Sequence, residues 1–210
     1  MNKNITLFST ASALLLAMAT AHAAPPTAEL KVIGTLTVPT CTVAATDDGV
    51  YDMGKISATL VKPNANTALS TMSKTWTVNC DAETYLNFKP VDNRADSAVV
   101  ANATSFGLGQ VNESGKIGYY TVTMKNGTVD GAASNLFSSP SATIATANAV
   151  AVSSANRNGW SSGTVQKSGK TFVADLEVAP FLGSTISMNG AITEDANIDG
   201  SLTLNFAYGI

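Results

Sequence analysis

The stretch from Ala28 to Cys41 reads Ala-Glu-Leu-Lys-Val-Ile-Gly-Thr-Leu-Thr-Val-Pro-Thr-Cys. Apolar residues or glycine occupy every second position from Ala28 to Val38, and polar residues lie between them, with Ile33 as the one exception. Because a strand turns successive side chains to opposite faces, this pattern predicts a strand with one apolar side. An apolar strand ahead of the first cysteine needs a groove to lie in, and we expect that groove to belong to another copy of the protein. From the alternation alone, an ordinary first strand of a complete sheet explains the pattern equally well.

The first residues have the features of a secretory signal peptide. Lys3 gives a short positive head, residues 11–19 are largely apolar, and Ala21-His22-Ala23 fits the small-x-small cleavage pattern. The alternative is a membrane anchor, but the apolar run is shorter than the roughly 20 residues that a spanning helix needs. We therefore predict a signal peptide at 1–23 and export of the chain.

Composition excludes several classes of function. The formal net charge is −3, charged residues make up 13% of the chain, and no basic cluster is visible, so we expect no nucleic-acid partner. The single histidine, His22, lies in the segment that we expect to be removed. Histidine-dependent catalysis and histidine metal sites are therefore not expected, and we predict no enzyme activity, no catalytic residue, no metal and no cofactor.

The chain contains two cysteines, Cys41 and Cys80. An even count in an exported chain indicates a disulfide, which would stabilise the fold by about 4 kcal/mol on the chain-entropy model. Free thiols or metal ligands are the alternative, which the lack of a Cys-x-x-Cys motif disfavours.

The rest of the chain predicts an all-β fold in one domain. No long segment after residue 23 has the 3.6-residue period of a helix, and short alternating segments are separated by Gly, Asn and Pro. Asn126-Gly127 is typical of a two-residue hairpin turn, and residues 132–169 predict an irregular exposed region with one strand. The predicted strands lie at 36–43, 50–56, 72–80, 83–89, 116–125, 144–152, 171–179, 186–192 and 201–208.

Two motifs have the spacing of known sites without their context. Residues 159–163 match G-x-S-x-G, but a nucleophile elbow needs a preceding strand, a following helix and a histidine base, so we interpret the motif as a loop turn. Asp195, Asn197, Asp199 and Gly200 match the start of a calcium loop, but Phe206 stands where a bidentate glutamate is needed. A polar turn is the better interpretation.

The two tryptophans are candidates for a sugar-binding platform. Trp76 lies in phase with Met72, Lys74, Val78 and Cys80, so core packing is the first interpretation. Trp160 lies in the region predicted to be a loop and is the better ligand candidate.

Taken together, these features resemble a chaperone–usher fimbrial subunit of the type 1-like pilins. Gly34 lies seven residues before Cys41, Leu30 and Val32 precede it in phase, and the segment 50–56 and the run that ends at Cys80 resemble the strands next to the two cysteines of that family. The chain also ends in alternating apolar residues, like the family's terminal strand: Leu202, Leu204, Phe206 and Tyr208. The chain departs from the family pattern in the two residues that follow Tyr208, in the lack of a glycine about a dozen residues before it, and in a longer middle. These departures fit a divergent, beta-fimbria-like branch.

The resemblance implies an immunoglobulin-like β-sandwich that lacks its last strand. It implies a donor-strand arm at 24–35 and a pilin domain at 36–210. The inward-facing donor residues would be Ala28, Leu30, Val32, Gly34 and Leu36, and the groove strand would carry Leu202, Leu204, Phe206 and Tyr208. The implied partners are other fimbrial subunits, a periplasmic chaperone, an outer-membrane usher and a host receptor reached through the fibre.

The expected function is therefore a structural subunit of a surface fimbria that supports cell adhesion. A minor or tip adhesin, or a carbohydrate-binding β-sandwich module, is the alternative. A secreted hydrolase is a third reading, which the missing histidine disfavours.

Overall fold

The computed structural model describes residues 25–209, and the predicted signal peptide at 1–23 lies outside these residues. The chain divides into two units, with the boundary between Leu36 and Thr37. The described part of the first unit, residues 25–36, contains no helix or strand, and every residue in it is exposed.

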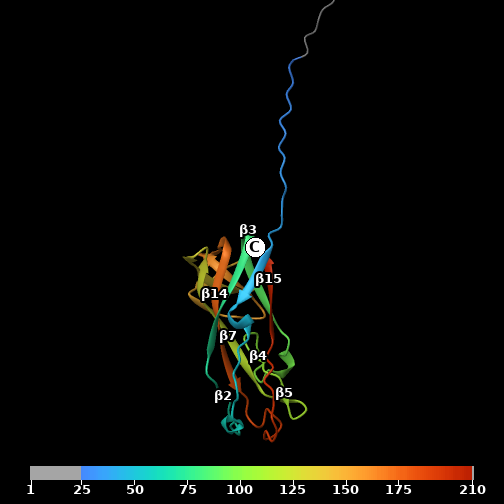
Figure 1. Cartoon of the computed structure of the whole chain (residues 1–210), viewed down its shortest axis with the longest axis vertical. Coiled ribbons are helices and arrows are strands. Elements are labelled where there is room, and N and C mark those ends of the chain that lie inside the picture. The colour runs from blue at the N-terminus through green and yellow to red at the C-terminus, as the bar shows by residue number, and fades with distance from the viewer. Residues whose placement is uncertain (1–24, 210) are drawn as a thin grey trace, which may run out of the picture. The chain divides into compact units, whose positions relative to one another are not determined.

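The second unit is nearly all β, which confirms the predicted fold class at that level (Figure 1). Among the described residues, η2 (Ala58–Leu60) and η3 (Ala95–Ser97) are single 3-10 turns, and η1 (Thr46–Gly49) is a turn in which Asp47 and Asp48 have positive φ angles. Its strands are β1 (Cys41–Ala45), β2 (Thr67–Ala68), β3 (Met72–Asp92), β4 (Phe106–Gly107), β5 (Gln110–Val111), β6 (Gly115–Lys116), β7 (Gly118–Val129), β8 (Ala132–Ala133), β9 (Asn135–Ser139), β10 (Thr146–Ala147), β11 (Ala149–Ala151), β12 (Arg157–Ser162), β13 (Val165–Gln166), β14 (Ser168–Leu182) and β15 (Leu202–Tyr208).

The long strand β3 organises the antiparallel sheet. Its first half pairs with β1 and β14, and its second half pairs with β15 and β12. β14 continues to β7 and then β11, whereas β12 continues to β9 and then β10. The sheet therefore curls, because one strand belongs to both of its halves.

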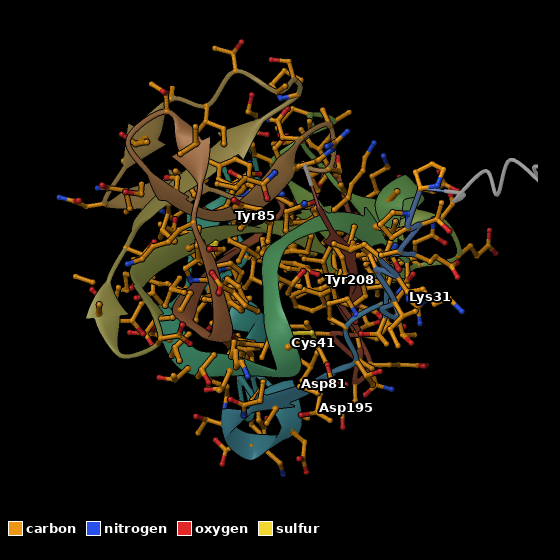
Figure 2. The ribbon with its side chains drawn as sticks, turned by 90° about the horizontal axis from the view of Figure 1, so that it is seen from above. Lys31, Cys41, Asp81, Tyr85, Asp195 and Tyr208 are labelled. Atoms are coloured by element: carbon orange, nitrogen blue, oxygen red, sulfur yellow. A yellow bond between two sulfur atoms is a disulfide. The ribbon has the colours of Figure 1, made fainter. Side chains whose placement is uncertain are left out.

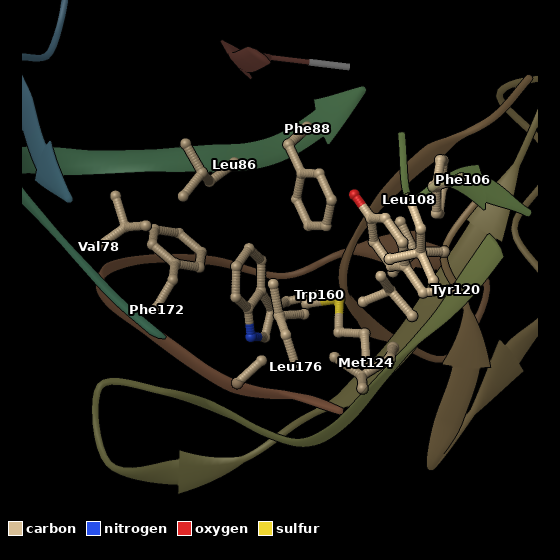
Figure 3. Packing of buried hydrophobic residues seen from close by; sticks show 14 of the residues in the cluster. Val78, Leu86, Phe88, Phe106, Leu108, Tyr120, Met124, Trp160, Phe172 and Leu176 are labelled. Carbon is tan, nitrogen blue, oxygen red and sulfur yellow. The ribbon is translucent and has the colours of Figure 1, made fainter. Parts of the chain in front are cut away.

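The two halves of the sheet share one apolar core. Leu86 and Phe88 from the second half of β3 and Trp160 from β12 pack with Phe172 and Leu176 from β14 (Figure 3). The ring centroids of Trp160 and Phe172 are 5.2 Å apart. Contacts between residues far apart in sequence therefore hold the curled sheet closed.

β1 and β15 lie along the same edge of β3, one after the other. The β1 register continues to Thr40, whose carbonyl accepts a 3.0 Å hydrogen bond from the backbone N–H of Asp81. At the end of β15, the N–H of Gly209 donates to the carbonyl of Tyr85 over 3.1 Å. Both bonds use odd-numbered residues of β3, and alternate residues of a strand direct their backbone groups to opposite sides. One side of β3 therefore carries both strands.

The predicted disulfide is confirmed. Cys41 and Cys80 are direct partners in the register of β1 and β3, and their sulfurs are bonded. The adjacent Asp81 closes the end of this ladder, because its Oδ1 accepts a 2.9 Å hydrogen bond from the N–H of Thr40 (Figure 2).

Two predicted strands near the amino end are not strands in the single chain. The strand predicted for 28–43 begins only at Cys41, and the segment 50–56 is extended without strand pairing. Gly54 has a φ of 62°, and its N–H bonds to the Asp52 side chain, which interrupts the predicted alternation. A strand needs a neighbour for its backbone groups, and the segment 50–56 pairs with no strand among residues 25–209.

The hairpin turn predicted at Asn126-Gly127 was misplaced. β7 runs through both residues, and the turn lies at Asp130-Gly131, where both φ angles are positive, between the paired residues Val129 and Ala132. Asn126 has a φ of 54° and instead lies at a bulge, where the register with β14 shifts between Val173 and Asp175. Asn-Gly and Asp-Gly have the same local preference, and only cross-strand pairing distinguishes them.

Three other predictions of secondary structure were also wrong. The region 132–169 is not mainly irregular, because it contains β8 to β13. The predicted strands 72–80 and 83–89 are one strand, β3, and residues 185–189 form turns instead of a strand. Short strands rich in Ser, Gly and Asn carry little periodic signal, so their partners determine them.

Candidate functional site

An apolar groove of about 970 Å³ lies beside the terminal strand β15. Residues 49–58 line one wall, and residues between Ile192 and Leu204 line the other. The floor is built from side chains of the core, which include Leu108, Ile117, Tyr120, Val122, Leu176, Val178, Leu182 and Met188. Seven of these eight floor side chains are buried and Val178 is half-buried, so the groove borders the hydrophobic core along one side of the second unit.

β15 supplies a wall with an open backbone edge. Its seven residues pair with β3 alone among the described strands, from Leu202 opposite Asp92 to Tyr208 opposite Leu86. Leu202, Leu204 and Phe206 are half-buried against the core, as the alternation predicts, whereas Tyr208 is 42% exposed. An unpaired edge next to apolar side chains is a surface that accepts another strand.

The groove does not extend along the whole of β15. Leu202 and Leu204 line it, but Phe206 does not; its ring lies 5.5 Å from that of Phe88. The part of the groove beside β15 therefore lies at the amino end of the strand and continues into residues 192–200.

The opposite wall is held by side chains instead of a backbone ladder. The hydroxyl of Tyr51 donates to the carbonyl of Leu176 over 2.9 Å, and Nε1 of Trp76 donates to the same hydroxyl oxygen over 3.2 Å. The buried Lys74 forms an ion pair with Asp47 at the start of this wall. Burial raises the pKa of Tyr51, the hydrogen bond from Trp76 opposes this shift, and the negative charge of Asp175 adds to it.

Tyr120 is the one tyrosine on the floor of the groove. Its ring packs 5.5 Å from that of Phe106, and a Cβ on Gly200 would lie 2.9 Å from the Tyr120 ring. Burial raises the pKa of Tyr120 well above its ordinary value, and the charge of Asp92 adds to the shift. Tyr120 is therefore a neutral part of the floor at any physiological pH.

The predicted donor residues lie in the first unit. Leu30, Val32 and Leu36 are 85%, 90% and 102% exposed, and Ala28 and Gly34 are exposed as well. The first unit thus contains an alternating apolar segment that is not buried within that unit.

The sugar-binding and nucleophile candidates are part of the core instead. Trp160 lies in β12, not in a loop, is 3% exposed, and donates from Nε1 to the carbonyl of Val173 over 2.8 Å. It therefore cannot form a sugar platform. Ser161 of the G-x-S-x-G motif is also buried in β12, and its hydroxyl has no hydrogen-bond partner among residues 25–209.

The calcium-like sequence at 195–200 belongs to a segment without helix or strand that lines the groove. Asp199 forms an ion pair with Arg94, with 3.0 Å between Nε and Oδ2. Residues 25–209 contain no group of three or more His, Cys, Asp or Glu side chains placed to hold a metal ion. Within the same residues, no helix has the length and apolar character needed to cross a membrane.

Two comparisons relate this chain to other proteins. The family model described as a protein of unknown function (DUF1120) matches residues 30–106. Protein GltF of Escherichia coli (strain K12) is 32% identical over 109 residues, which make up 50% of this chain and 43% of that protein. The chain thus spans less than half the length of this relative. The family match begins inside the alternating segment and includes the disulfide, the wall at 49–58 and all of β3.

Sequence reasoning did not anticipate most of the residues around this groove. Leu202 and Leu204 line it, and their role as a groove strand for a donor arm stays a prediction. The floor residues come from four separate segments, so no local signal could have assembled them. The Tyr51 anchor has no sequence signature either, because its partner Leu176 lies 125 positions away.

Proposed function

We propose that this protein is a structural subunit of a surface fimbria, exported to the periplasm and assembled by donor-strand exchange. The body would be an incomplete immunoglobulin-like β-sandwich, and the arm at 24–35 of a neighbouring subunit would complete it. The observation that carries this proposal is the apolar groove beside the open edge of β15.

The arm and the groove have complementary chemistry. Ala28, Leu30, Val32 and Leu36 share the apolar face of the arm with Gly34, and the groove floor is made of aliphatic and aromatic side chains. Burying each large apolar side chain contributes roughly 1.5–3 kcal/mol. Backbone bonds along β15 would add to this, as in other cases where an extended segment completes a sheet. Such a contact holds a fibre together without a covalent link.

The register of β3 leaves no place for the arm on the edge of β3 that β15 occupies. Extended backwards from Cys41–Cys80 and Thr40–Asp81, the β1 ladder would place Thr35 opposite Leu86. β15 already pairs with β3 from Leu86 to Asp92. Residues up to Thr35 therefore cannot continue along β3, so the apolar segment needs a different edge.

The half-buried apolar side chains along the groove, such as Ile56, Leu202 and Leu204, would favour a temporary occupant before assembly. We propose a periplasmic chaperone in that role and an outer-membrane usher at the exchange step. Other copies of this chain or related subunits would be the permanent partners, and the fibre would carry the contact with a host receptor. An adhesin that binds sugar through Trp160 is not proposed, because that side chain is buried.

The test is assembly of the purified, oxidised protein. Unheated samples in SDS should give a ladder of multimers, and deletion of residues 24–35 should abolish it. Gly34→Leu should also abolish the ladder, because the added side chain points into the groove. Thr35→Leu is the matched control: it adds a similar side chain on the outward face and should leave the ladder intact.

Each variant needs a check that the body is folded, by circular dichroism and by the oxidised state of Cys41 and Cys80. A ladder that persists without residues 24–35 would show that the arm does not join the subunits. Equal effects of Gly34→Leu and Thr35→Leu would remove the argument that one face of the arm is buried.

A further inference from the structure

The alternation that defines β15 begins well before that strand. The even positions from 196 to 208 are, in order, Ala, Ile, Gly, Leu, Leu, Phe and Tyr. Ile192 fits the same apolar series, which Glu194 interrupts. The odd positions from 193 to 205 are all polar. Ile192 and Ile198 are half-buried against the core and line the groove together with Leu202 and Leu204. Residues 192–200 thus have the side-chain pattern of a strand, although they form none in the single chain.

Three hydrogen bonds fix the direction of the backbone groups. The N–H of Asp199 donates to the carbonyl of Leu108 over 3.2 Å, and the N–H of Asn93 donates to the carbonyl of Ser201 over 3.0 Å. The N–H of Gly209 donates to Tyr85 in the same way. All three bonds use odd-numbered residues of the terminal segment and point toward the body. In an extended chain, the even-numbered residues therefore turn their N–H and C=O groups to the open side.

The open side has no partner in the described part of the chain. Residues 192–200 pair with no strand there, and the backbone groups of Ala196, Ile198 and Gly200 make no hydrogen bond within residues 25–209. The ladder with β3 stops at Leu202 because β3 ends at its partner Asp92, and the chain then turns at 93–94. The segment therefore has the residue pattern of a strand but no neighbouring strand to pair with among the described residues.

We infer that residues 192–200 extend the pairing edge of β15, so that a docked strand forms backbone hydrogen bonds with a continuous edge from 192 to 204. The occupant is the arm at 28–36 of a second copy of this chain, so the inference rests on the proposed function. The apolar face of the arm matches the even positions of the edge. On docking, residues 192–200 become a strand.

The test uses two proline substitutions at neighbouring exposed residues. Ala196→Pro removes an N–H on the open side, whereas Asn197→Pro removes one on the body side that has no partner among residues 25–209. A fluorescent peptide with residues 25–37 is titrated into monomeric full-length protein, and binding is followed by anisotropy. We expect Ala196→Pro to weaken binding roughly tenfold and Asn197→Pro to change it less than about threefold.

Amide hydrogen exchange gives a second readout that does not depend on a variant. Saturation with the peptide should slow exchange at Ala196, Ile198 and Gly200 by about tenfold or more, together with Leu202 and Leu204. The extended edge would be overturned if the peptide slowed amide exchange at Leu202 and Leu204 but at no residue before Leu202. It would also be overturned if both proline substitutions weakened peptide binding equally. Neither result would contradict donor-strand exchange itself. If the peptide does not bind the unmodified protein at all, the proposed function fails, and this inference fails with it.

Discussion

The hydroxyl of Tyr51 donates a 2.9 Å hydrogen bond to the carbonyl of Leu176, and this bond joins two segments that are 125 positions apart. Tyr51 belongs to a wall without strand pairing, whereas Leu176 lies in β14, at the centre of the sheet. The Trp76 indole bonds to the same hydroxyl oxygen. One side chain therefore positions a groove wall that the backbone alone would leave loose.

Tyr51→Phe should loosen this wall. The substitution removes the donor to Leu176 and leaves the Trp76 N–H without its acceptor, which costs about 1–3 kcal/mol of unfolding free energy. Urea unfolding followed by circular dichroism measures the loss. Tyr85→Phe is the control, because Tyr85 is exposed and its hydroxyl has no hydrogen bond within residues 25–209. Equal stabilities of the two variants would show that the wall does not depend on the Tyr51 hydroxyl.

Trp160→Ala should destabilise the protein strongly. The side chain is buried against Phe172, and its removal leaves a cavity at the junction of the two halves of the sheet, which costs about 3–5 kcal/mol. Trp160→Phe should lose less, because it keeps most of the apolar volume and gives up the hydrogen bond to Val173. The midpoint of urea unfolding measures both. A Trp160→Ala protein of unchanged stability would contradict the core position of this residue.

Asp175 should make stability depend on pH in the acid range. Hydrogen bonds from Asn126 at 2.8 Å and from Thr75 at 2.6 Å lower the pKa of Asp175 below its ordinary value of 3.8. A carboxylate with a lowered folded-state pKa contributes stability above its unfolded-state pKa and loses it as pH falls through the folded-state pKa. Stability should therefore fall below about pH 4, and Asp175→Asn should flatten part of this decrease.

Urea midpoints at pH 7, 4 and 2.5 measure the effect. Asp48→Asn is the matched control, because the Asp48 side chain is exposed and makes no hydrogen bond within residues 25–209. An unchanged acid profile in Asp175→Asn would mean that the two hydrogen bonds do not favour the charged form.

Where the sequence pattern was strictly periodic, it predicted the structure well. The strands around Trp76, Tyr120, Phe172 and Leu204 alternate clearly, and β3, β7, β14 and β15 cover them. The pattern failed at 132–169, where short strands take their shape from neighbours, and at Asn126-Gly127, where a bulge replaced a turn. It also failed for Trp160, because a Ser- and Gly-rich surrounding resembles a loop until β9 and β3 pair with it.

The sequence by itself determined the alternating apolar faces, the cysteine pair and the all-β character, because each of these follows from the order of residues along the chain. Only the tertiary structure decided that a groove lies beside β15, that its floor comes from β7, β14 and the segments at 108 and 188, and that Tyr51 holds its far wall. The reason is physical: a groove is a relation between segments distant in sequence, and its walls depend on which backbone groups remain without partners after the sheet has formed.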